Sequence, residues 1–86
     1  MKEIWILGIH ITNRVQKVSD IQDILTKFGC TIKTRLGLHE VKDDFCDPGG
    51  LIILELTGSL EEFEKLENQL LNVEGLEVKK MVFTRG

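Results

Sequence analysis

The stretch that decides the fold runs from Thr34 to Gly58 and reads TRLGLH (34–39), EVKDDFCDPGG (40–50) and LIILELTG (51–58). The first part ends a run of alternating apolar and polar residues, which predicts a half-exposed strand over 30–39. Residues 51–56 are apolar apart from Glu55, which predicts that the strand over 51–57 is covered on both faces. The loop over 40–50 is longer than a hairpin needs, since about two to five residues suffice to reverse the chain.

Before this stretch, the sequence predicts a strand and a helix. Positions 4–11 are apolar on both alternating sets, which indicates a central strand. Thr12 or Asn13 is expected to cap the helix that follows, and Gly29 is expected to end it in the left-handed conformation. The helix carries one apolar stripe, made by Val18, Ile21, Ile24, Leu25 and Phe28.

The strand over 30–39 is expected to lie at an edge of the sheet, because it has one apolar and one polar side. Cys30 is expected to be a small apolar residue of the core. One side is assigned to Cys30, Ile32, Thr34, Leu36 and Leu38, and the other to Thr31, Lys33, Arg35, Gly37 and His39.

After the stretch, a second helix and a last strand are predicted. Ser59 and Glu62 have the spacing of a capping box, and Gly75 is expected to end the helix. The buried stripe is assigned to Phe63, Leu66, Leu70 and Val73, widened by Leu60 and Leu71. The last strand is predicted over 76–83, with Leu76, Val78 and Val82 facing inward.

The order is therefore βαββαβ, in one domain that covers residues 1–86. Two right-handed crossovers and one central hairpin give an α+β, ferredoxin-like βαββαβ sandwich. It has a four-stranded antiparallel sheet with two helices on one face. In this fold the first and third strands are central, and these are the two runs that are apolar on both sides.

The composition narrows the class of function. The net charge is −3 at pH 7 with no basic stripe, so direct nucleic-acid binding is not expected. The chain has two cysteines, which is typical of a reducing cytoplasm rather than of a secreted disulfide scaffold. The first apolar run stops at His10 and is too short to cross a bilayer, so no membrane segment is expected.

The two helices can cover only one face of the sheet. The residues left on the other face are predicted to be Ile4, Ile6, Leu51, Ile53, Met81 and Phe83. An apolar patch of this kind favours burial against another copy, so a homodimer or a higher homo-oligomer is expected. The alternative is that the stems of Lys33, Arg35, Glu55 and Lys79 cover the patch.

One end of the sheet collects residues that can hold a metal. His10 ends the first strand, His39 ends the second, and Cys46 lies in the acidic loop that follows. Imidazole and thiolate suit a transition metal such as nickel, zinc or iron, with His10 supplied by a neighbouring subunit. The alternative is a free loop cysteine beside an ordinary strand-end histidine.

Asn13, Arg14 and Arg35 are candidates for binding an anionic small effector. The alternatives are that Arg35 pairs with Glu55 across strands and that Arg14 lies in a solvated first turn. An enzyme is not expected, because the sequence has no nucleophile elbow, no P-loop and no GxGxxG. Cys46 and His39 are the one nucleophile pair available, and an acidic loop disfavours the thiolate.

Three segments resemble a known family: Ile11 to Arg14, Ile24 to Gly29, and Ile32 to Leu38. They are similar to the small iron-only hydrogenase system regulators, which resemble ACT domains and the C-terminal sensor domain of the nickel-responsive repressor. The resemblance covers about residues 3–83. It implies a cytoplasmic, ferredoxin-like homo-oligomer with a regulatory role.

The nickel sensor holds its metal with histidines on the second strand and a cysteine at the start of the third. His39 and Cys46 match that pattern, whereas Gly37 stands where a second histidine would be needed. In ACT domains the effector lies at the first loop, where Asn13 and Arg14 match. The resemblance therefore favours a non-enzymatic regulatory domain with an effector or metal site at the loop end of the sheet. The alternatives are a ligand-free protein–protein interaction module and, less favoured, a cysteine-dependent enzyme.

Overall fold

The chain, seen here as a computed structural model, is described over residues 2–38, 41–42, 45–46 and 50–85. Within these residues the elements are β1 (Lys2–Ile11), α1 (Val18–Lys27), a short 3₁₀ turn η1 (Gly29–Thr31), β2 (Ile32–Leu38), β3 (Val41–Lys42), β4 (Phe45–Cys46), β5 (Gly50–Leu56), α2 (Leu60–Leu71) and β6 (Leu76–Arg85). No helix among them is both long and apolar enough to span a membrane.

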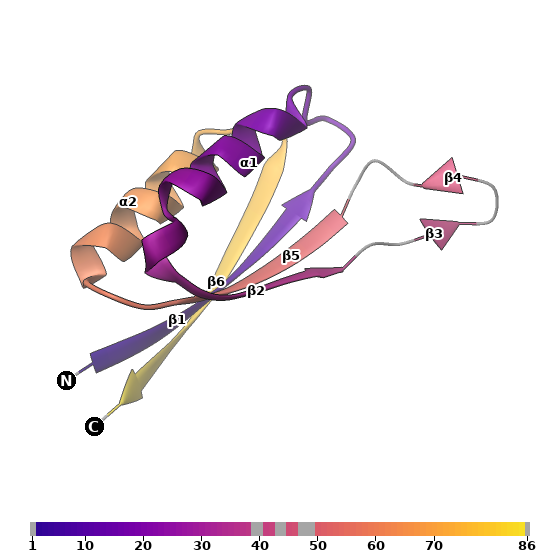
Figure 1. Cartoon of the computed structure of the whole chain (residues 1–86). Helices are drawn as coiled ribbons and strands as arrows, with labels where there is room; N and C mark the ends of the chain where they lie inside the picture. Colours follow the sequence, from indigo (N-terminus) through magenta and orange to yellow (C-terminus); the bar gives the residue numbers. More distant parts are fainter. Residues whose placement is uncertain (1, 39–40, 43–44, 47–49, 86) are drawn as a thin grey trace.

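The main sheet has the strand order β2-β5-β1-β6, and every neighbouring pair is antiparallel. Both helices lie on one face of this sheet (Figure 1). The predicted ferredoxin-like α+β sandwich is therefore confirmed. The two central strands, β1 and β5, are the two that the sequence predicts to be covered on both faces.

The predicted loop over 40–50 contains a second, smaller sheet, which the sequence interpretation missed. β3 and β4 pair antiparallel, with Val41 opposite Cys46 and Lys42 opposite Phe45. Valine and phenylalanine favour an extended backbone, and the connection is long enough to fold back on itself. Figure 1 shows β3 and β4 beyond the ends of β2 and β5, away from the two helices.

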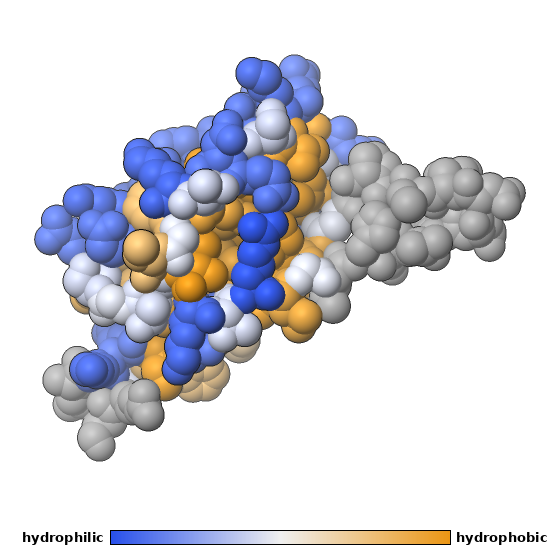
Figure 2. Space-filling view, in the orientation of Figure 1, coloured by the Kyte–Doolittle hydropathy of each residue, from blue (hydrophilic) through white to orange (hydrophobic). Residues whose placement is uncertain are grey.

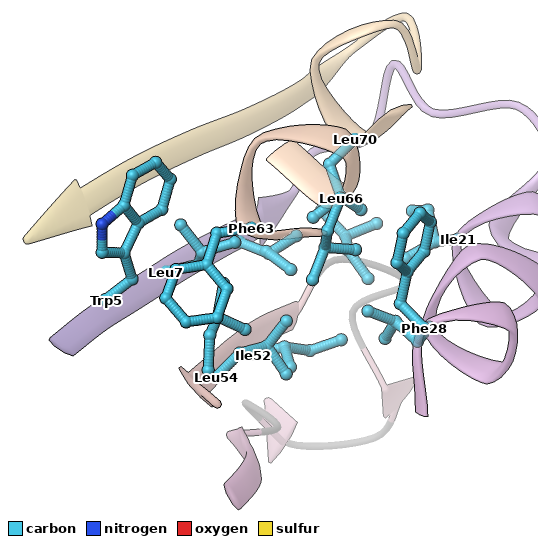
Figure 3. Close-up of a cluster of buried hydrophobic side chains, with 13 residues drawn as sticks. Trp5, Leu7, Ile21, Phe28, Ile52, Leu54, Phe63, Leu66 and Leu70 are labelled. Atoms are coloured by element: carbon cyan, nitrogen blue, oxygen red, sulfur yellow. The ribbon is translucent and has the colours of Figure 1, made fainter. Parts of the chain in front are cut away.

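The core lies between the sheet and the helices (Figure 3). Trp5 and Phe63 pack with their ring centroids 5.5 Å apart and are both buried, so both residues serve packing. The buried residues are Trp5, Leu7, Ile9, Ile11, Ile21, Leu25, Phe28, Ile52, Leu54, Leu56, Phe63, Leu66 and Leu70. Each large apolar side chain buried in this way stabilises the fold by about 1.5–3 kcal/mol.

Five residues predicted to face inward are exposed instead, and one of them is Val82 of β6, at 45%. Val18, Leu60 and Leu71 lie at the ends of the two helices, where the sheet no longer covers the apolar stripe. Cys30 lies in η1 and is exposed, whereas the next residue, Thr31, is buried. The 3₁₀ turn reorients the chain before β2, so the alternation of the strand does not extend back to Cys30.

The first helix begins later than predicted, and neither Thr12 nor Asn13 caps it. The N-cap position is Lys17, with no hydrogen bond from its side chain. The Thr12 hydroxyl donates instead to the carbonyl oxygen of Gly75 at 2.6 Å. The cap of α2 is as predicted, because the Ser59 hydroxyl accepts from the Glu62 backbone N–H at 3.3 Å.

Two glycines differ in their roles. Gly29 does not have the expected positive φ; it begins η1 instead. Gly75 has a φ of +84°, as expected for a left-handed residue, and lies in the turn between α2 and β6. Neither glycine therefore ends its helix in the predicted manner, because α2 already ends at Leu71 with Asn72 as its C-cap.

A register shift in β2 changes which residues share a face. Ile32 pairs with Leu56, whereas Thr34 pairs with Glu55, so β2 carries one more residue than β5 between these pairs. Such a bulge reverses the alternation. Thr34 and Leu36 therefore face away from the helices, and the expectation that they share a side with Ile32 is wrong.

Candidate functional site

The face of the sheet opposite the helices, called the open face below, carries a set of apolar side chains. Cross-strand register assigns to it Ile4, Ile6, Gly8 and His10 of β1, Thr34 and Leu36 of β2, Leu51, Ile53 and Glu55 of β5, and Glu77, Lys79, Met81 and Phe83 of β6. All six residues predicted for an oligomer interface lie on this face. Their role as an interface stays a prediction.

The apolar part of the open face is accessible. Met81 and Phe83 are 56% and 52% exposed, and Ile4, Ile6 and Ile53 are half-buried. Leu36, which the sequence interpretation did not include, is 54% exposed beside Ile53. Figure 2 shows the molecule from the side of α1 and β2, where hydrophilic surface predominates around the top of α1 and hydrophobic surface gathers between α1 and β2.

The alternative that charged stems cover this face is wrong for Arg35, whereas Glu55 and Lys79 do lie on the open face. Arg35 pairs with Leu54 and so lies on the helix side of the sheet, away from the open face. Lys33 lies 3.8 Å from Glu55, and Thr34 donates to Glu55 at 3.1 Å, so these groups gather near one edge. Met81 and Phe83 stay more than half exposed, so within the part of the chain described here they are not covered.

His10 lies on the open face at the loop end of the sheet. Its Nδ1 is 3.1 Å from a carboxylate oxygen of Glu77, the residue opposite it on β6. Both side chains are about half exposed, at 52% and 55%. His39 and the side chain of Cys46 lie outside the described residues, so the predicted metal site stays a prediction. In the described part no three His, Cys, Asp or Glu residues form a group that fits a metal ion.

Asn13 and Arg14 form a tight turn at the end of β1 and are exposed. The Arg14 backbone N–H donates to the Thr12 hydroxyl at 3.2 Å, and the Val15 N–H donates to the Thr12 carbonyl at 3.1 Å. The turn packs directly on Gly75: a side chain there would meet the Arg14 carbonyl carbon at 2.8 Å. Nothing in the local sequence signals this contact between residues about sixty positions apart.

Arg35 does not join Asn13 and Arg14. Its guanidinium donates to the side-chain oxygen of Gln22 in α1 at 2.8 Å, and its pairing with Glu55 is wrong because the two face opposite sides. Through Leu54 and Leu7, Arg35 lies level with the middle of β1, about 13 Å along the strand from Ile11. Of the three residues predicted to bind an effector, Asn13 and Arg14 lie together and Arg35 lies apart from them.

A hollow that the sequence did not predict lies at the other end of the sheet. Its volume is about 460 Å³, and it lies where β1 begins and α2 follows β5. The residues that line it are Lys2, Glu3, Ile4, Lys33, Glu55, Leu56, Thr57, Gly58, Leu60 and Phe63. Its charged groups are of mixed sign, and Lys33 and Glu55 already face each other, so it does not select a ligand of one charge.

No protein-family model and no curated protein sequence significantly matches the chain. Among solved structures, the uncharacterized protein TM1266 from Thermotoga maritima matches with a TM-score of 0.78 and 21% identity, over 96% of this chain and 100% of that one. The de novo designed protein Foldit4 matches with a TM-score of 0.54 and 17% identity, over 99% and 100%. CPII from Thiomonas intermedia K12, bound to ADP, AMP and acetate, matches with a TM-score of 0.50 and 16% identity, over 99% and 94%. At these identities the likeness establishes the fold alone.

Proposed function

We propose that the protein is a non-enzymatic regulatory module that works as a homo-oligomer in the cytoplasm. In this proposal a small effector or a transition metal binds at the loop end of the sheet. The observation that carries it is the open face, where Leu36, Met81 and Phe83 are each more than half exposed on one side of the sheet. A second copy of the chain removes this surface from water at once.

Two likenesses support the regulatory part of the proposal. The segments quoted above resemble the iron-only hydrogenase system regulators and ACT domains, which implies a sensing role. The fold is similar to that of CPII, which was solved with ADP, AMP and acetate bound. In this proposal the effector position of this chain is the end of the sheet that carries His10, Asn13 and Arg14, together with residues 39–50.

The oligomer is tested with two matched variants, Met81→Asp and Leu71→Asp. Both residues are equally exposed in one chain, at 56% and 55%, but Met81 lies on the open face and Leu71 on α2. An unpaired charge buried in an interface costs about 3 kcal/mol, roughly a 100-fold weaker association. Sedimentation velocity over a concentration series should show oligomers for the parent and Leu71→Asp, and monomers for Met81→Asp. A parent protein that stays monomeric at high concentration contradicts the proposal.

The effector site is tested separately, on the parent protein purified without an affinity tag. Metal analysis is compared between the parent and the variants His10→Ala, His39→Ala and Cys46→Ala. Equal metal content in all four proteins argues against metal ligation by these residues. Thermal shift with amino acids, nucleotides and divalent metals covers the other effectors, because a ligand at 100 times its Kd adds about 2.7 kcal/mol.

A ligand-free interaction module is the second candidate function. It is favoured by the division of the predicted effector set, since Arg35 binds Gln22 rather than facing the turn at Asn13 and Arg14. A flat thermal-shift response in an oligomeric parent protein selects this candidate over the effector-binding one.

A further inference from the structure

The three strand registers fix which residues lie side by side on the open face. One row across the strands holds Leu36, Ile53, Gly8 and Lys79, and the next holds Thr34, Glu55, Ile6 and Met81. The apolar side chains therefore run diagonally. They begin with Leu36 and Leu51 at the loop end and finish with Met81 and Phe83 on β6.

Opposite charges flank this diagonal. Lys79 lies on one side of it, on β6, and Glu55 lies on the other side, on β5. They are two strands and one row apart, which corresponds to about 12 Å between their Cα atoms. Midway between them is the segment of β1 that contains Ile6 and Gly8. Within the described ranges Lys79 forms no ion pair. Glu55 forms a long one, with 3.8 Å between its carboxylate oxygen and the Lys33 amine.

Gly8 is a second feature that the single chain does not explain. It lies in the middle of a central strand, where glycine is unfavourable because it leaves nothing to pack and costs conformational entropy. Its φ is not positive, and an added Cβ would meet nothing closer than 3.9 Å. The chain itself therefore has room for a side chain at this position. Glycine at such a place is typical of a close approach by another molecule.

We propose that a second copy packs on the open face about a two-fold axis that runs parallel to the sheet, between the two copies, in the direction of the apolar diagonal. This arrangement rests on the proposed homo-oligomer and specifies it. Rotation about that axis brings Lys79 of each copy over Glu55 of the other, so that two ion pairs form by symmetry. It also brings Ile53 of each copy to the flat surface at Gly8 of the other. The partner that fits the open face must place a negative charge opposite Lys79 and a positive charge opposite Glu55. A second copy of this chain does so.

A mixing experiment tests the proposed contact. Lys79→Glu alone places two like-charged pairs in the interface, and Glu55→Lys alone does the same with the opposite sign. Each variant should associate about tenfold more weakly than the parent, or worse. When the two variants are mixed, a heterodimer regains both opposite-charge pairs, Glu with Lys in each direction. Native mass spectrometry of the mixture, with one variant isotopically labelled, should show mainly heterodimer.

The controls are charge reversals on the helix side, Lys17→Glu and Glu64→Lys, alone and mixed. Both residues are exposed and lie away from the open face, so the two variant proteins should associate as the parent protein does. The mixture is the decisive sample, because Glu55→Lys also meets Lys33 within its own chain. Restored association on mixing cannot come from an effect inside one chain.

The substitution Gly8→Val gives an independent test. A Cβ atom at Gly8 would meet nothing closer than 3.9 Å in the monomer, and valine favours a strand, so the variant should fold with unchanged or higher stability at low concentration. It should nevertheless associate about tenfold more weakly or worse, because the added atoms occupy the position of the partner's Ile53.

Two results overturn the inference and are distinguishable from failure of the proposed function. A dimeric parent whose Lys79→Glu and Glu55→Lys variants associate unchanged, or fail to form heterodimers, shows that the copies meet in another orientation. A Gly8→Val variant that associates as tightly as the parent shows the same. A monomeric parent protein removes the proposed homo-oligomer itself.

Discussion

Gly75→Ala is expected to be the most damaging single-methyl change in the chain, for two reasons that the structure separates. Gly75 has a φ of +84°, and a left-handed backbone costs a residue with a Cβ about 1–2 kcal/mol. The new Cβ would lie 2.8 Å from the Arg14 carbonyl carbon and 2.9 Å from the Val15 nitrogen. These are backbone atoms, so the turn itself must shift, and overpacking of this kind costs about 1–3 kcal/mol.

The sum is about 3 kcal/mol, which is a large part of the roughly 4–13 kcal/mol expected for a chain of 86 residues. Gly58→Ala is the matched control for the backbone cost. Gly58 also has a positive φ, +115°, but nothing lies within 4 Å of its Cβ position. It should lose only about 1–2 kcal/mol. The difference between the two variants measures the contact of the turn at Arg14 and Val15 with Gly75.

Urea unfolding followed by circular dichroism gives both values, provided that the m-values of parent and variants agree. All samples should carry Met81→Asp, because association would otherwise add stability that depends on protein concentration. If Gly75→Ala costs no more than Gly58→Ala, the packing of residues 12–15 on Gly75 does not hold the end of the sheet, and the reasoning above is refuted.

Two further predictions concern charged groups on α2 and β6. Lys80→Ala should lower the free energy of unfolding by about 0.5–1 kcal/mol and change the tryptophan fluorescence, because the Lys80 amine lies 4.1 Å from the Trp5 ring centre and 3.2 Å from Glu67. Lys80→Arg should change the unfolding free energy less. Glu62, together with Glu61, holds the pKa of Lys65 above its usual 10.5. Because the pKa is higher in the folded state, this stabilisation is present below about pH 10.5 and is lost as the pH rises through the raised value. Glu62→Gln should move the Lys65 titration in an NMR experiment back toward 10.5, and an unchanged titration would show that these carboxylates do not act on it.

The order of elements and the central strands were predictable because the signal lies in the chain itself. β1 and β5 are the strands whose two alternating sets are both apolar, and any sheet with one helical layer places such strands inside. The stripes of α1 and α2 were predictable at Ile21, Leu25 and Leu66 for the same reason. The predicted burial was wrong at Val18 and Leu71, which are the first residue of α1 and the last residue of α2. A periodic pattern does not show where along a helix the packing against the sheet ends.

The turn at residues 12–15 was not predictable from its own sequence. A threonine or asparagine before a helix favours a cap, but the Thr12 hydroxyl is engaged by the carbonyl of Gly75. The partner is distant in sequence, so no local rule reveals the competition. The helix then begins only at Val18. The turn at Asn13 and Arg14 is consequently not the N-terminus of α1.

The bulge in β2 is the error with the widest consequence, and it acts on two candidate sites at once. One extra residue between Ile32 and Thr34 exchanges the faces of the residues that follow. Arg35 thereby moves to the helix side and pairs with Gln22, so the proposed effector cluster loses its strand-borne arginine. Leu36 moves the other way and enlarges the open face beside Ile53. The same shift that weakens the case for an anion clamp therefore adds apolar surface to the face on which a second copy is proposed to pack.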